Sequence, residues 1–423
     1  MARLPDDFLL GSASAAHQVE GGLWNDWMRM EEEEPERILD GSSARVAIDH
    51  FHRYREDLEL LASLHQNAQR FSIEWSRVEP QPGCFDPAAL AHYADVIATC
   101  HRLGMEPVVT LQHFTLPVWL ADRGGLLAPD APRLFARFAA ACAVALGAGV
   151  RWWVTVNEPN VLCHFAYNEG YFPPHQRSTG LALAASRAML RMHVAASTAL
   201  HTVAAQHGRQ ALVGLATHER RLRGAPGSPL NALAARLPDF IFNRWMLQSL
   251  ARGRMLWPVG RGESVAGAAE SLDFIGLNYY CEDQVVFDPR STGTLMARTV
   301  PFDGAVYTTF GSPVQPEGLQ RALTSLWAEF GLPILITESG VADNHDELRA
   351  QYIVDHLRAV VRAREEGVDV RGYLYWTGFD NFEWLPGYSQ KFGLVAVDRE
   401  TLTRTPKPSS AVYAEICRTR VVS

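Results

Sequence analysis

Short apolar runs alternate with longer helical patterns about eight times along this chain. Alternation of this kind is typical of repeated βα units, which build a parallel sheet. Eight parallel strands that are buried on both faces predict a closed barrel rather than an open sheet. The predicted strands are 8–16, 67–75, 106–113, 152–158, 211–218, 273–280, 333–338 and 370–377.

The segments between these runs have the spacing of amphipathic helices, as in 49–64, 86–104 and 346–367. The last of them ends at Gly367, which is a helix stop signal. No change of composition and no linker divides the chain. The sequence therefore predicts an α/β fold in a single domain, a (β/α)8 TIM barrel over residues 1–423.

Two further features concern the loops and the first turn. The turn after the first strand lacks the Gly-x-Gly-x-x-Gly pattern of dinucleotide-binding folds. Stretches rich in Gly, Pro and Ser at 222–230 and 288–316 follow the fifth and sixth predicted strands. In a barrel, loops at these places are expected to shape the mouth of a pocket.

Composition narrows the classes of partner. The chain has 423 residues, 47% of them hydrophobic, and a formal net charge of −8, which does not attract nucleic acid or anionic lipid. The longest apolar run, 138–150, is too short to span a bilayer. Asp6 and Asp7 remove the positive region that a signal peptide needs. The charge balance therefore favours a small-molecule substrate. Six cysteines without metal-like spacing predict reduced thiols, so we expect a cytoplasmic protein.

Polar residues follow seven of the eight predicted strands. The carboxyl ends of barrel strands meet at one mouth, where barrel enzymes carry their chemistry. Any one strand-end glutamate has an ordinary alternative role as a helix cap, but capping gives no reason for seven polar ends together. The segments are "AAHQVEG", "QRFSIEW", "LQHF", "TVNEP", "LNYY", "ITESG" and "YWTGFDNFEW".

Two glutamates, Glu158 and Glu338, each close a markedly apolar strand and precede a turn former. They come from strands four and seven, which lie across a barrel from one another. Two facing carboxyl groups are the minimum for glycoside cleavage, because one protonates the departing oxygen while the other attacks the anomeric carbon or activates water.

Arg70 suggests which carboxyl group has which role. An arginine in a barrel strand is costly unless it faces a carboxylate, which it then keeps ionised. If Arg70 pairs with Glu338, then Glu338 is the nucleophile. Glu158, in apolar surroundings and near an anion, is expected to keep its proton and to act as the acid, and later as the base.

These motifs, in this order, resemble those of the family 1 retaining β-glycosidases almost from end to end. "NDWMRME", "RFSIEWSRVEP", "TVNEPNV", "DFIGLNYY", "ITESG" and "DNFEW" all match family segments. The resemblance implies a (β/α)8 barrel without metal or cofactor. It also implies an exo-acting enzyme that hydrolyses terminal β-glucosides, β-galactosides or β-fucosides with retention, through a covalent glycosyl-enzyme.

The resemblance also implies roles for single residues. Glu158 matches the family's acid/base and Glu338 its nucleophile, with Arg70 beside it and Tyr280 orienting it. Asn157 matches the residue that holds the sugar 2-hydroxyl. The residues that match sugar ligands, including the ring platform Trp376, are Gln18, His113, Asn278, Trp376, Glu383 and Trp384.

Three segments depart from the family pattern, at Thr115, at Ser339 and at Thr377-Gly378, which leaves the ranking of substrates open. The acidic Glu383 favours an unphosphorylated sugar, since a carboxylate repels phosphate.

Other classes of protein stay open from the sequence. A transglycosylase would use the same intermediate, and a carbohydrate-binding protein would keep the pocket without the chemistry. A metal-dependent barrel hydrolase would need a His-x-His pair on the first strand, where the chain has only His17. The preferred sugar, and whether the chain forms a homo-oligomer, are not determined by the sequence.

Overall fold

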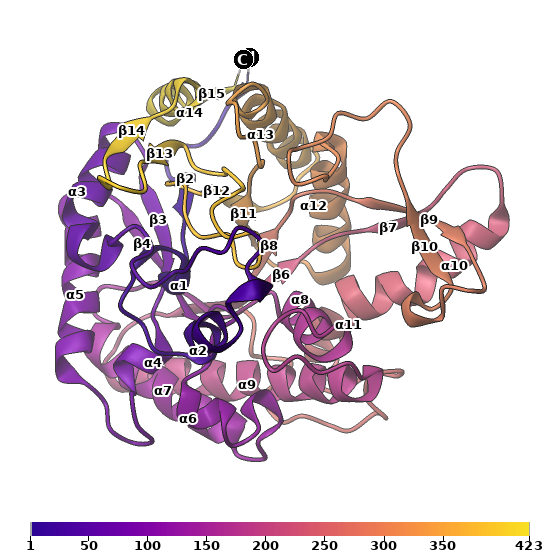
Figure 1. The fold of residues 1–423 in the computed structure, drawn as a ribbon, viewed down its shortest axis with the longest axis horizontal. Coiled ribbons are helices and arrows are strands. Elements are labelled where there is room, and N and C mark those ends of the chain that lie inside the picture. Colours follow the sequence, from indigo (N-terminus) through magenta and orange to yellow (C-terminus); the bar gives the residue numbers. More distant parts are fainter. Residues whose placement is uncertain (1, 423) are drawn as a thin grey trace.

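A computed structural model describes residues 2–422. Eight parallel strands hydrogen bond side by side and close into a barrel, because β12 returns to β2 (Figure 1). Each predicted strand overlaps one strand of this barrel, so the predicted (β/α)8 fold is confirmed. In barrel order the strands are β2 (Leu9–Ala13), β3 (Ala68–Ser72), β4 (Glu106–Gln112), β5 (Trp152–Asn157), β6 (Leu212–His218), β8 (Phe274–Asn278), β11 (Ile334–Ser339) and β12 (Val370–Trp376).

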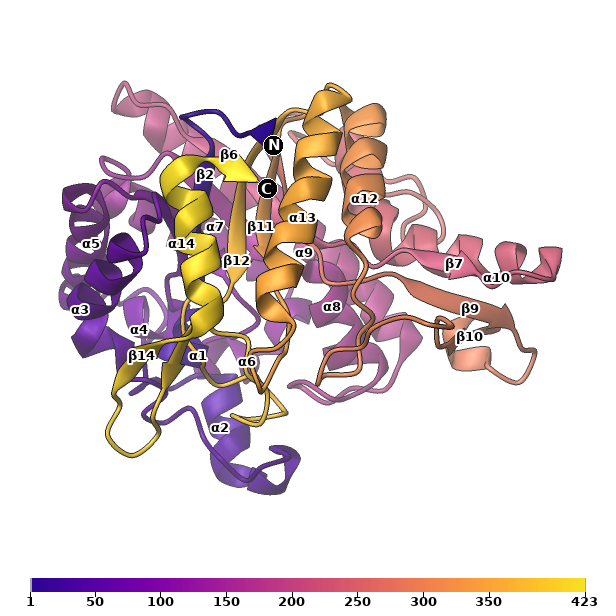
Figure 2. The same cartoon turned by 90° about the horizontal axis from the view of Figure 1, so that it is seen from above.

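Long helices surround the barrel (Figures 1 and 2). Their amphipathic spacing places one apolar face against the strands. In the part of the chain that the structure describes, no helix is both long and apolar enough to cross a membrane. The surrounding helices are α3 (His50–Ser63), α5 (Pro87–Arg102), α7 (Ala131–Leu146), α9 (Thr179–Gln206), α11 (Trp245–Ala251), α12 (Pro316–Phe330), α13 (Arg349–Glu365) and α14 (Pro408–Thr419).

Alternate residues of the strands supply two different cores. On β4, Val109 and Leu111 belong to the large core between strands and helices, whereas Val108 belongs to a smaller core of inward-facing residues. Ala68 of β3 lies in the smaller core, and Arg70 follows it by two residues. Since side chains alternate along a strand, Arg70 also points into the barrel.

Short elements follow the carboxyl ends of the first four barrel strands and join them to the long helices. Their side chains provide much of the surroundings of the strand-end residues. These elements are α1 (Ala16–Val19), α2 (Asp26–Glu33), η1 (Pro35–Arg37), α4 (Trp75–Val78), α6 (Val118–Ala121), η2 (Gly125–Leu127), α8 (Pro159–Cys163) and the π-helix η3 (His164–Asn168).

A small sheet projects from the side of the barrel (Figure 1). The prediction of plain loops at 222–230 and 288–316 is wrong in part, because these segments contribute β7, α10 and β10. Ser228 caps α10 through the N–H of Leu230, and Pro229 occupies the first turn. The elements are β7 (Leu222–Gly224), α10 (Pro229–Asp239), the π-helix η4 (Phe240–Arg244), β9 (Asp283–Phe287), η5 (Thr292–Thr294) and β10 (Ala297–Val300).

The first and last strands of the described chain lie side by side (Figure 2). Near the amino terminus, β1 (Ala2–Arg3) pairs antiparallel with β15 (Val421–Val422). Between β12 and α14, the strands β13 (Val395–Val397) and β14 (Arg404–Pro406) form a further antiparallel pair. Helix α14 therefore lies between two paired strands, β14 before it and β15 after it.

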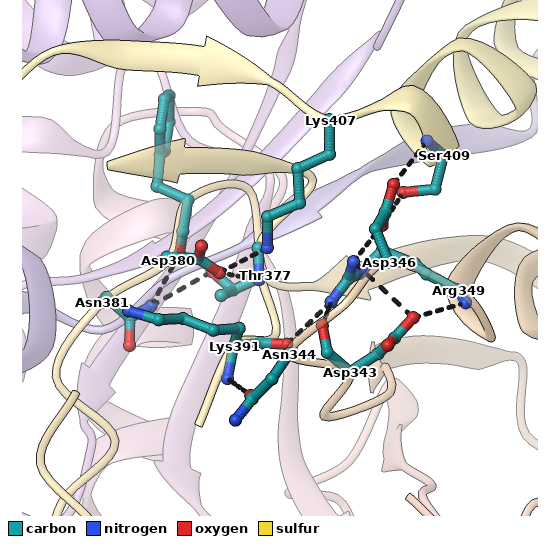
Figure 3. A network of polar contacts seen from close by, with 12 residues as sticks. Asp343, Asn344, Asp346, Arg349, Thr377, Asp380, Asn381, Lys391, Lys407 and Ser409 are labelled. Carbon is teal, nitrogen blue, oxygen red and sulfur yellow. Dashed lines mark hydrogen bonds and ion pairs between the residues drawn. The ribbon is translucent and has the colours of Figure 1, made fainter. Parts of the chain in front are cut away.

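The segment between β12 and β13, which carries Glu383 and Trp384, is held by a polar network (Figure 3). Arg349 of α13 donates to the backbone oxygen of Lys391 (2.7 Å) and to that of Asp343 (2.9 Å), and it pairs with Asp346. The Arg349 side chain is fully buried. A buried guanidinium needs such complete pairing, because an unpaired buried charge is costly.

Lys407 attaches the same segment from the other side (Figure 3). Its ammonium group donates to Asp380 Oδ1 (2.8 Å), which also accepts from the backbone N–H of Gly393 (2.8 Å). Asn381 is tied to the first barrel strand's end, since Gln18 donates to its Oδ1 (3.3 Å). These contacts determine where Glu383 and Trp384 lie.

Replacing Arg349 by methionine is expected to lower the free energy of unfolding by about 3 kcal/mol or more, because it leaves the carboxylate of Asp346 without its buried cation. Urea unfolding measures this difference. The control is Arg371→Met on β12, since Arg371 forms an exposed pair with Asp369 worth at most about 1 kcal/mol. Equal losses in the two variants would contradict the role given to Arg349.

Candidate active site

Glu158 lies where β5 ends and the chain turns into α8. Its backbone is left-handed (φ 43°, ψ 57°), a conformation that is uncommon outside glycine. Its N–H donates to the backbone oxygen of Ala216 on β6 (2.7 Å), and Pro159 begins the helix. The residue is 6% exposed. The apolar run of β5 thus ends by holding a buried carboxyl group at the carboxyl end of the barrel.

Glu338, near the end of β11, has a hydrogen-bond donor at each carboxyl oxygen. Arg70 Nη1 lies 2.5 Å from Oε1, and the hydroxyl of Tyr280 donates to Oε2 (2.7 Å). The residue is 3% exposed. The predicted ion pair with Arg70 is therefore present, and both contacts are those that an ionised carboxylate accepts.

Arg70 connects four strands of the barrel. Besides Glu338, it donates from Nε to Thr110 (3.0 Å) and from Nη2 to Asn157 Oδ1 (2.6 Å). It also donates to the backbone oxygen of Thr337 (3.1 Å). The side chain is fully buried, so these contacts fix the guanidinium and, through it, the orientation of Glu338.

Asn157 stands between Arg70 and His113. Its Oδ1 accepts from Arg70 and from Asn278 Nδ2 (3.1 Å), and its Nδ2 lies 3.1 Å from His113 Nε2. Since the oxygen is occupied by two donors, Nδ2 donates to His113 and the proton of the imidazole is on Nδ1. His113 Nδ1 is buried and has no hydrogen-bond partner among the described residues.

Asn278, the last residue of β8, is held by protein contacts. Its amide group donates to Asn157 and to Glu158 Oε1 (2.8 Å), and its oxygen accepts from Thr337 (2.6 Å). These protein contacts use both amide hydrogens. These contacts orient Glu158 and Asn157, and the role of Asn278 as a sugar ligand stays a prediction.

Gln18, which follows β2, and Glu383, which follows β12, contact each other at the carboxyl ends of these two neighbouring strands. Gln18 Nε2 donates to the backbone oxygen of Phe382 (2.7 Å) and to Glu383 Oε2 (3.3 Å). Gln18 Oε1 is buried without a partner among the described residues. An unpaired buried acceptor is costly unless a ligand supplies a donor, as a sugar hydroxyl would.

A cluster of aromatic rings lies beside these polar residues. The ring of His113 is nearly parallel to that of Trp376 (centroids 5.8 Å apart, 20°) and to that of Trp384 (6.1 Å, 16°). Trp384 also stacks on His17 (5.4 Å, 7°), and Trp376 hydrogen bonds to Glu383. The structure thus brings all the predicted strand-end residues into one connected cluster.

The buried carboxyl groups of this cluster affect one another. Burial raises the pKa of Glu338 to about 7 against the opposing charge of Arg70, and the charge of Glu158 adds to the effect. Burial, followed by the charge of Glu338, raises the pKa of Glu383 to about 8. Carboxylates that repel one another in this way share protons rather than titrating independently.

Glu158 behaves differently. Burial opposes its ionisation, but the charge and hydrogen bond of His218, with the donor Asn278, outweigh burial and hold the pKa of Glu158 below its usual value. The sequence predicted the reverse, a protonated Glu158 and an ionised Glu338. The prediction differs because it contained no partner for Glu158 and gave too little weight to the burial of Glu338.

His218 is the functional candidate that sequence reasoning missed. It is the last residue of β6, and its Nδ1 lies 2.8 Å from Glu158 Oε1. The signal that points to it was present, because 211–218 was the one predicted strand to which no polar end had been assigned. A histidine closing that strand belongs to the same edge of the barrel as the other strand ends.

Two of the residues that depart from the family pattern have protein partners of their own. Thr115 donates to Glu74 Oε2 (2.9 Å), and Ser339 hydrogen bonds with the hydroxyl of Tyr352 (3.0 Å).

Among the residues that the structure describes, no group of three or more His, Cys, Asp or Glu side chains is arranged to hold a metal ion.

Comparison with known proteins agrees with this geometry. The family model described as glycosyl hydrolase family 1 matches residues 1–421. The chain is 30% identical to beta-glucosidase A of Thermotoga maritima, with 98% of each chain covered. It is 32% identical to a bifunctional beta-D-glucosidase/beta-D-fucosidase of Bifidobacterium breve, with 97% of each covered.

A solved structure extends the likeness to three dimensions. The beta-glucosidase from Thermotoga maritima in complex with deoxynojirimycin superposes with a TM-score of 0.94 at 28% identity, and the full length of both chains is covered. The family resemblance found in the sequence is therefore confirmed: the chain is a glycoside hydrolase that belongs to glycosyl hydrolase family 1.

Proposed function

We propose that the protein is a retaining, exo-acting β-glycosidase that hydrolyses terminal unphosphorylated β-D-glucosides, with β-galactosides and β-fucosides as further substrates. The observation that carries this proposal is the pair of buried carboxyl groups at 158 and 338, which have different donors and repel one another. Retaining enzymes hold their two carboxyl groups about 5 Å apart. Two carboxylates at that separation repel each other, as the charges of Glu158 and Glu338 do here.

In the first proposed step, ionised Glu338 attacks the anomeric carbon while the bond to the leaving oxygen breaks. Glu158 gives its proton to that oxygen, so the aglycone leaves as a neutral alcohol. The contacts of Arg70 and Tyr280 stabilise the ionised form of Glu338 before the attack. The two carboxyl groups titrate as a coupled pair, and in the reactive form of this pair the shared proton lies on Glu158.

In the second step, water attacks the glycosyl ester and gives a proton to Glu158, which is now a carboxylate. Esterification has removed the negative charge of Glu338, so the base no longer competes with a neighbouring anion. Two displacements at one carbon restore the original configuration. One pair of side chains thus accounts for retention without a further group.

The sugar-binding assignments rest on unpaired buried atoms and on charge. Gln18 Oε1 and His113 Nδ1 are, respectively, an acceptor and a donor without protein partners in the described chain, which suits sugar hydroxyls. Glu383 hydrogen bonds with Gln18 and Trp376 and is repelled by Glu338 and Glu158. Three carboxyl groups disfavour a phosphate here, which supports an unphosphorylated sugar.

The relatives suggest the substrate class. The name of the Thermotoga maritima relative refers to glucosides, and that of the Bifidobacterium breve relative refers to fucosides as well. The six cysteines are free thiols, which supports the proposal of a reducing, cytoplasmic environment.

The test is a panel of 4-nitrophenyl β-D-glycosides, read as kcat/KM, with proton NMR of the first anomer released. We expect turnover of the glucoside and first release of the β-anomer. First release of the α-anomer would contradict retention, and no turnover of any β-glycoside would contradict the proposed activity. Adding an alcohol acceptor shows whether the glycosyl-enzyme also transfers its sugar to an alcohol.

Replacing Arg70 by methionine is expected to shift the acidic limb of the kcat/KM profile to higher pH by about one unit, because the cation that favours ionised Glu338 is lost. The pH dependence with the 4-nitrophenyl glucoside measures the shift. Arg102→Met, at an exposed arginine of α5, serves as the control. A limb that stays in place would contradict the coupling between Arg70 and Glu338.

A further inference from the structure

The two carboxyl oxygens of Glu158 have different surroundings. Oε1 lies 2.8 Å from His218 Nδ1 and 2.8 Å from Asn278 Nδ2. No hydrogen bond to Oε2 is found among residues 2–422. Asn278 Nδ2 can only donate, so Oε1 acts as an acceptor. One oxygen of Glu158 is therefore held by the protein, and the other is free to meet a substrate.

The His218 ring is itself held in place. It stacks on the ring of Tyr280 (centroids 5.7 Å apart, 16°), and the ring of Phe242 meets it edge-on (6.1 Å, 83°). Asn160 donates to the backbone oxygen of His218 (2.7 Å). The imidazole is thus held by ring contacts with Tyr280 and Phe242 and at its backbone, and Nδ1 faces Glu158.

The charged and titratable groups around His218 come from several elements. Glu158 at the end of β5 contacts it directly, and Tyr280 after β8 connects it to Glu338, which pairs with Arg70. Phe242, which contacts His218, also contacts His164 of η3. The next residue, Glu219, faces away and pairs with Arg244 of η4. Glu158 is the carboxyl group that His218 contacts.

Resting on the proposed function, we propose that His218 is a positioning residue for the acid/base. Together with Asn278 it donates to Oε1 of Glu158 and so directs the transferable proton to Oε2. An oxygen that already accepts two N–H donors has no room for a proton of its own. The proton of the acid form therefore lies on the oxygen that has no protein partner, where the leaving oxygen of the glycoside would receive it.

The same contact serves the second step. When Glu158 is a carboxylate, both donors stabilise its charge and keep Oε2 as the oxygen that takes the proton from water. Hydrogen bonds to the charged form of an acid favour ionisation, in agreement with the pKa of Glu158, which the charge and hydrogen bond of His218 help to hold below its usual value. Loss of His218 should therefore delay ionisation of Glu158 on raising the pH.

The test compares three variants on two β-glucosides, one with a 2,4-dinitrophenyl leaving group and one with an alkyl leaving group. His218→Phe keeps a ring for Tyr280 to stack on but removes the donor. His218→Asn places a neutral amide donor near the position of Nδ1. His164→Asn is the control, because His164 also contacts Phe242 but forms no hydrogen bond or ion pair with Glu158 among the described residues.

With His218→Phe we expect kcat/KM to fall about tenfold or more on the alkyl glucoside and less than about threefold on the dinitrophenyl glucoside. The basic limb of the kcat/KM profile should move to higher pH by about one unit. His218→Asn should restore most of the alkyl activity, since it restores a donor. Equal losses on both substrates with an unmoved basic limb would mean a merely structural role and would overturn the proposal.

The two proposals fail in different ways. If the unchanged protein turns over no β-glycoside, the proposed function is wrong. If it does so and His218→Phe has the leaving-group dependence and pH profile of the unchanged protein, only the role of His218 is wrong. Should His218→Phe not fold, His218→Gln provides the same comparison, because its amide is displaced from the position of Nδ1.

Discussion

Replacing Glu338 by alanine is expected to lower kcat for aryl β-glucosides by at least about 10⁴-fold, as for loss of other catalytic nucleophiles. Glu338 is the carboxylate with a charged donor at one oxygen and a hydroxyl donor at the other. Glu20, after β2, also accepts from an arginine and a tyrosine, but it lacks the coupling to Glu158, which adds to burial in raising the pKa of Glu338 to about 7. Without Glu338, the first bond to the anomeric carbon cannot form.

Azide distinguishes a lost nucleophile from a damaged protein. The shortened side chain leaves room for the anion, which can attack the anomeric carbon from the side of residue 338 and displace the aglycone in one step. One displacement inverts the centre, so the expected product is the α-glycosyl azide. A β-glycosyl azide would contradict the role of Glu338.

The matched control is Glu347→Ala, since Glu347 is an exposed glutamate in the segment that follows β11. It should retain the activity and pH profile of the unchanged protein. Thermal melting of both variants measures whether loss of the carboxylate beside the buried Arg70 also affects stability.

Replacing Glu158 by glutamine is expected to slow cleavage of glycosides with poor leaving groups by about 10²- to 10⁴-fold. The amide oxygen can still accept from His218 and Asn278, so the shape of the site is preserved while the proton is lost. A 2,4-dinitrophenolate leaves without protonation, and its release should be little affected. The measurement is kcat/KM on substrates whose leaving groups differ in pKa.

The second step should also slow in this variant, because no base accepts the proton of water. With an activated substrate, the glycosyl-enzyme is then expected to accumulate, visible as a burst of phenolate and as a mass increase of one glycosyl group. Glu169→Gln, in the segment that follows η3, is the control. Equal losses on poor and good leaving groups would argue against acid catalysis by Glu158.

The fold was predictable because it depends on short-range pattern. Strands buried on both faces read as apolar runs, and the helices between them read as amphipathic stretches. Each predicted strand is therefore found within a few residues of its place, as with 152–158 and Trp152–Asn157. The small lateral sheet was missed because β7 and β10 are short and only half buried, so that little apolar pattern marks them.

The composition of the candidate site was predictable for a topological reason. Parallel strands of a barrel all end at one edge, so the residue that closes each strand, such as Glu158 or Glu338, lies near the others whatever the loops do. The pairing of Arg70 with Glu338 followed from the cost of an unpaired charge inside a barrel. Both inferences need only strand order and the alternation of side chains.

The sequence by itself determined the barrel, the family and most of the strand-end residues, since these follow from periodicity and from motifs that stand in a fixed order. Only the tertiary structure decided which partner each side chain has. It placed His218 against Glu158, turned Asn278 toward protein acceptors, and buried Glu338 deeply enough to raise its pKa to about 7. Protonation depends on solvent exclusion and on charges a few ångströms away, which come from residues distant in the sequence.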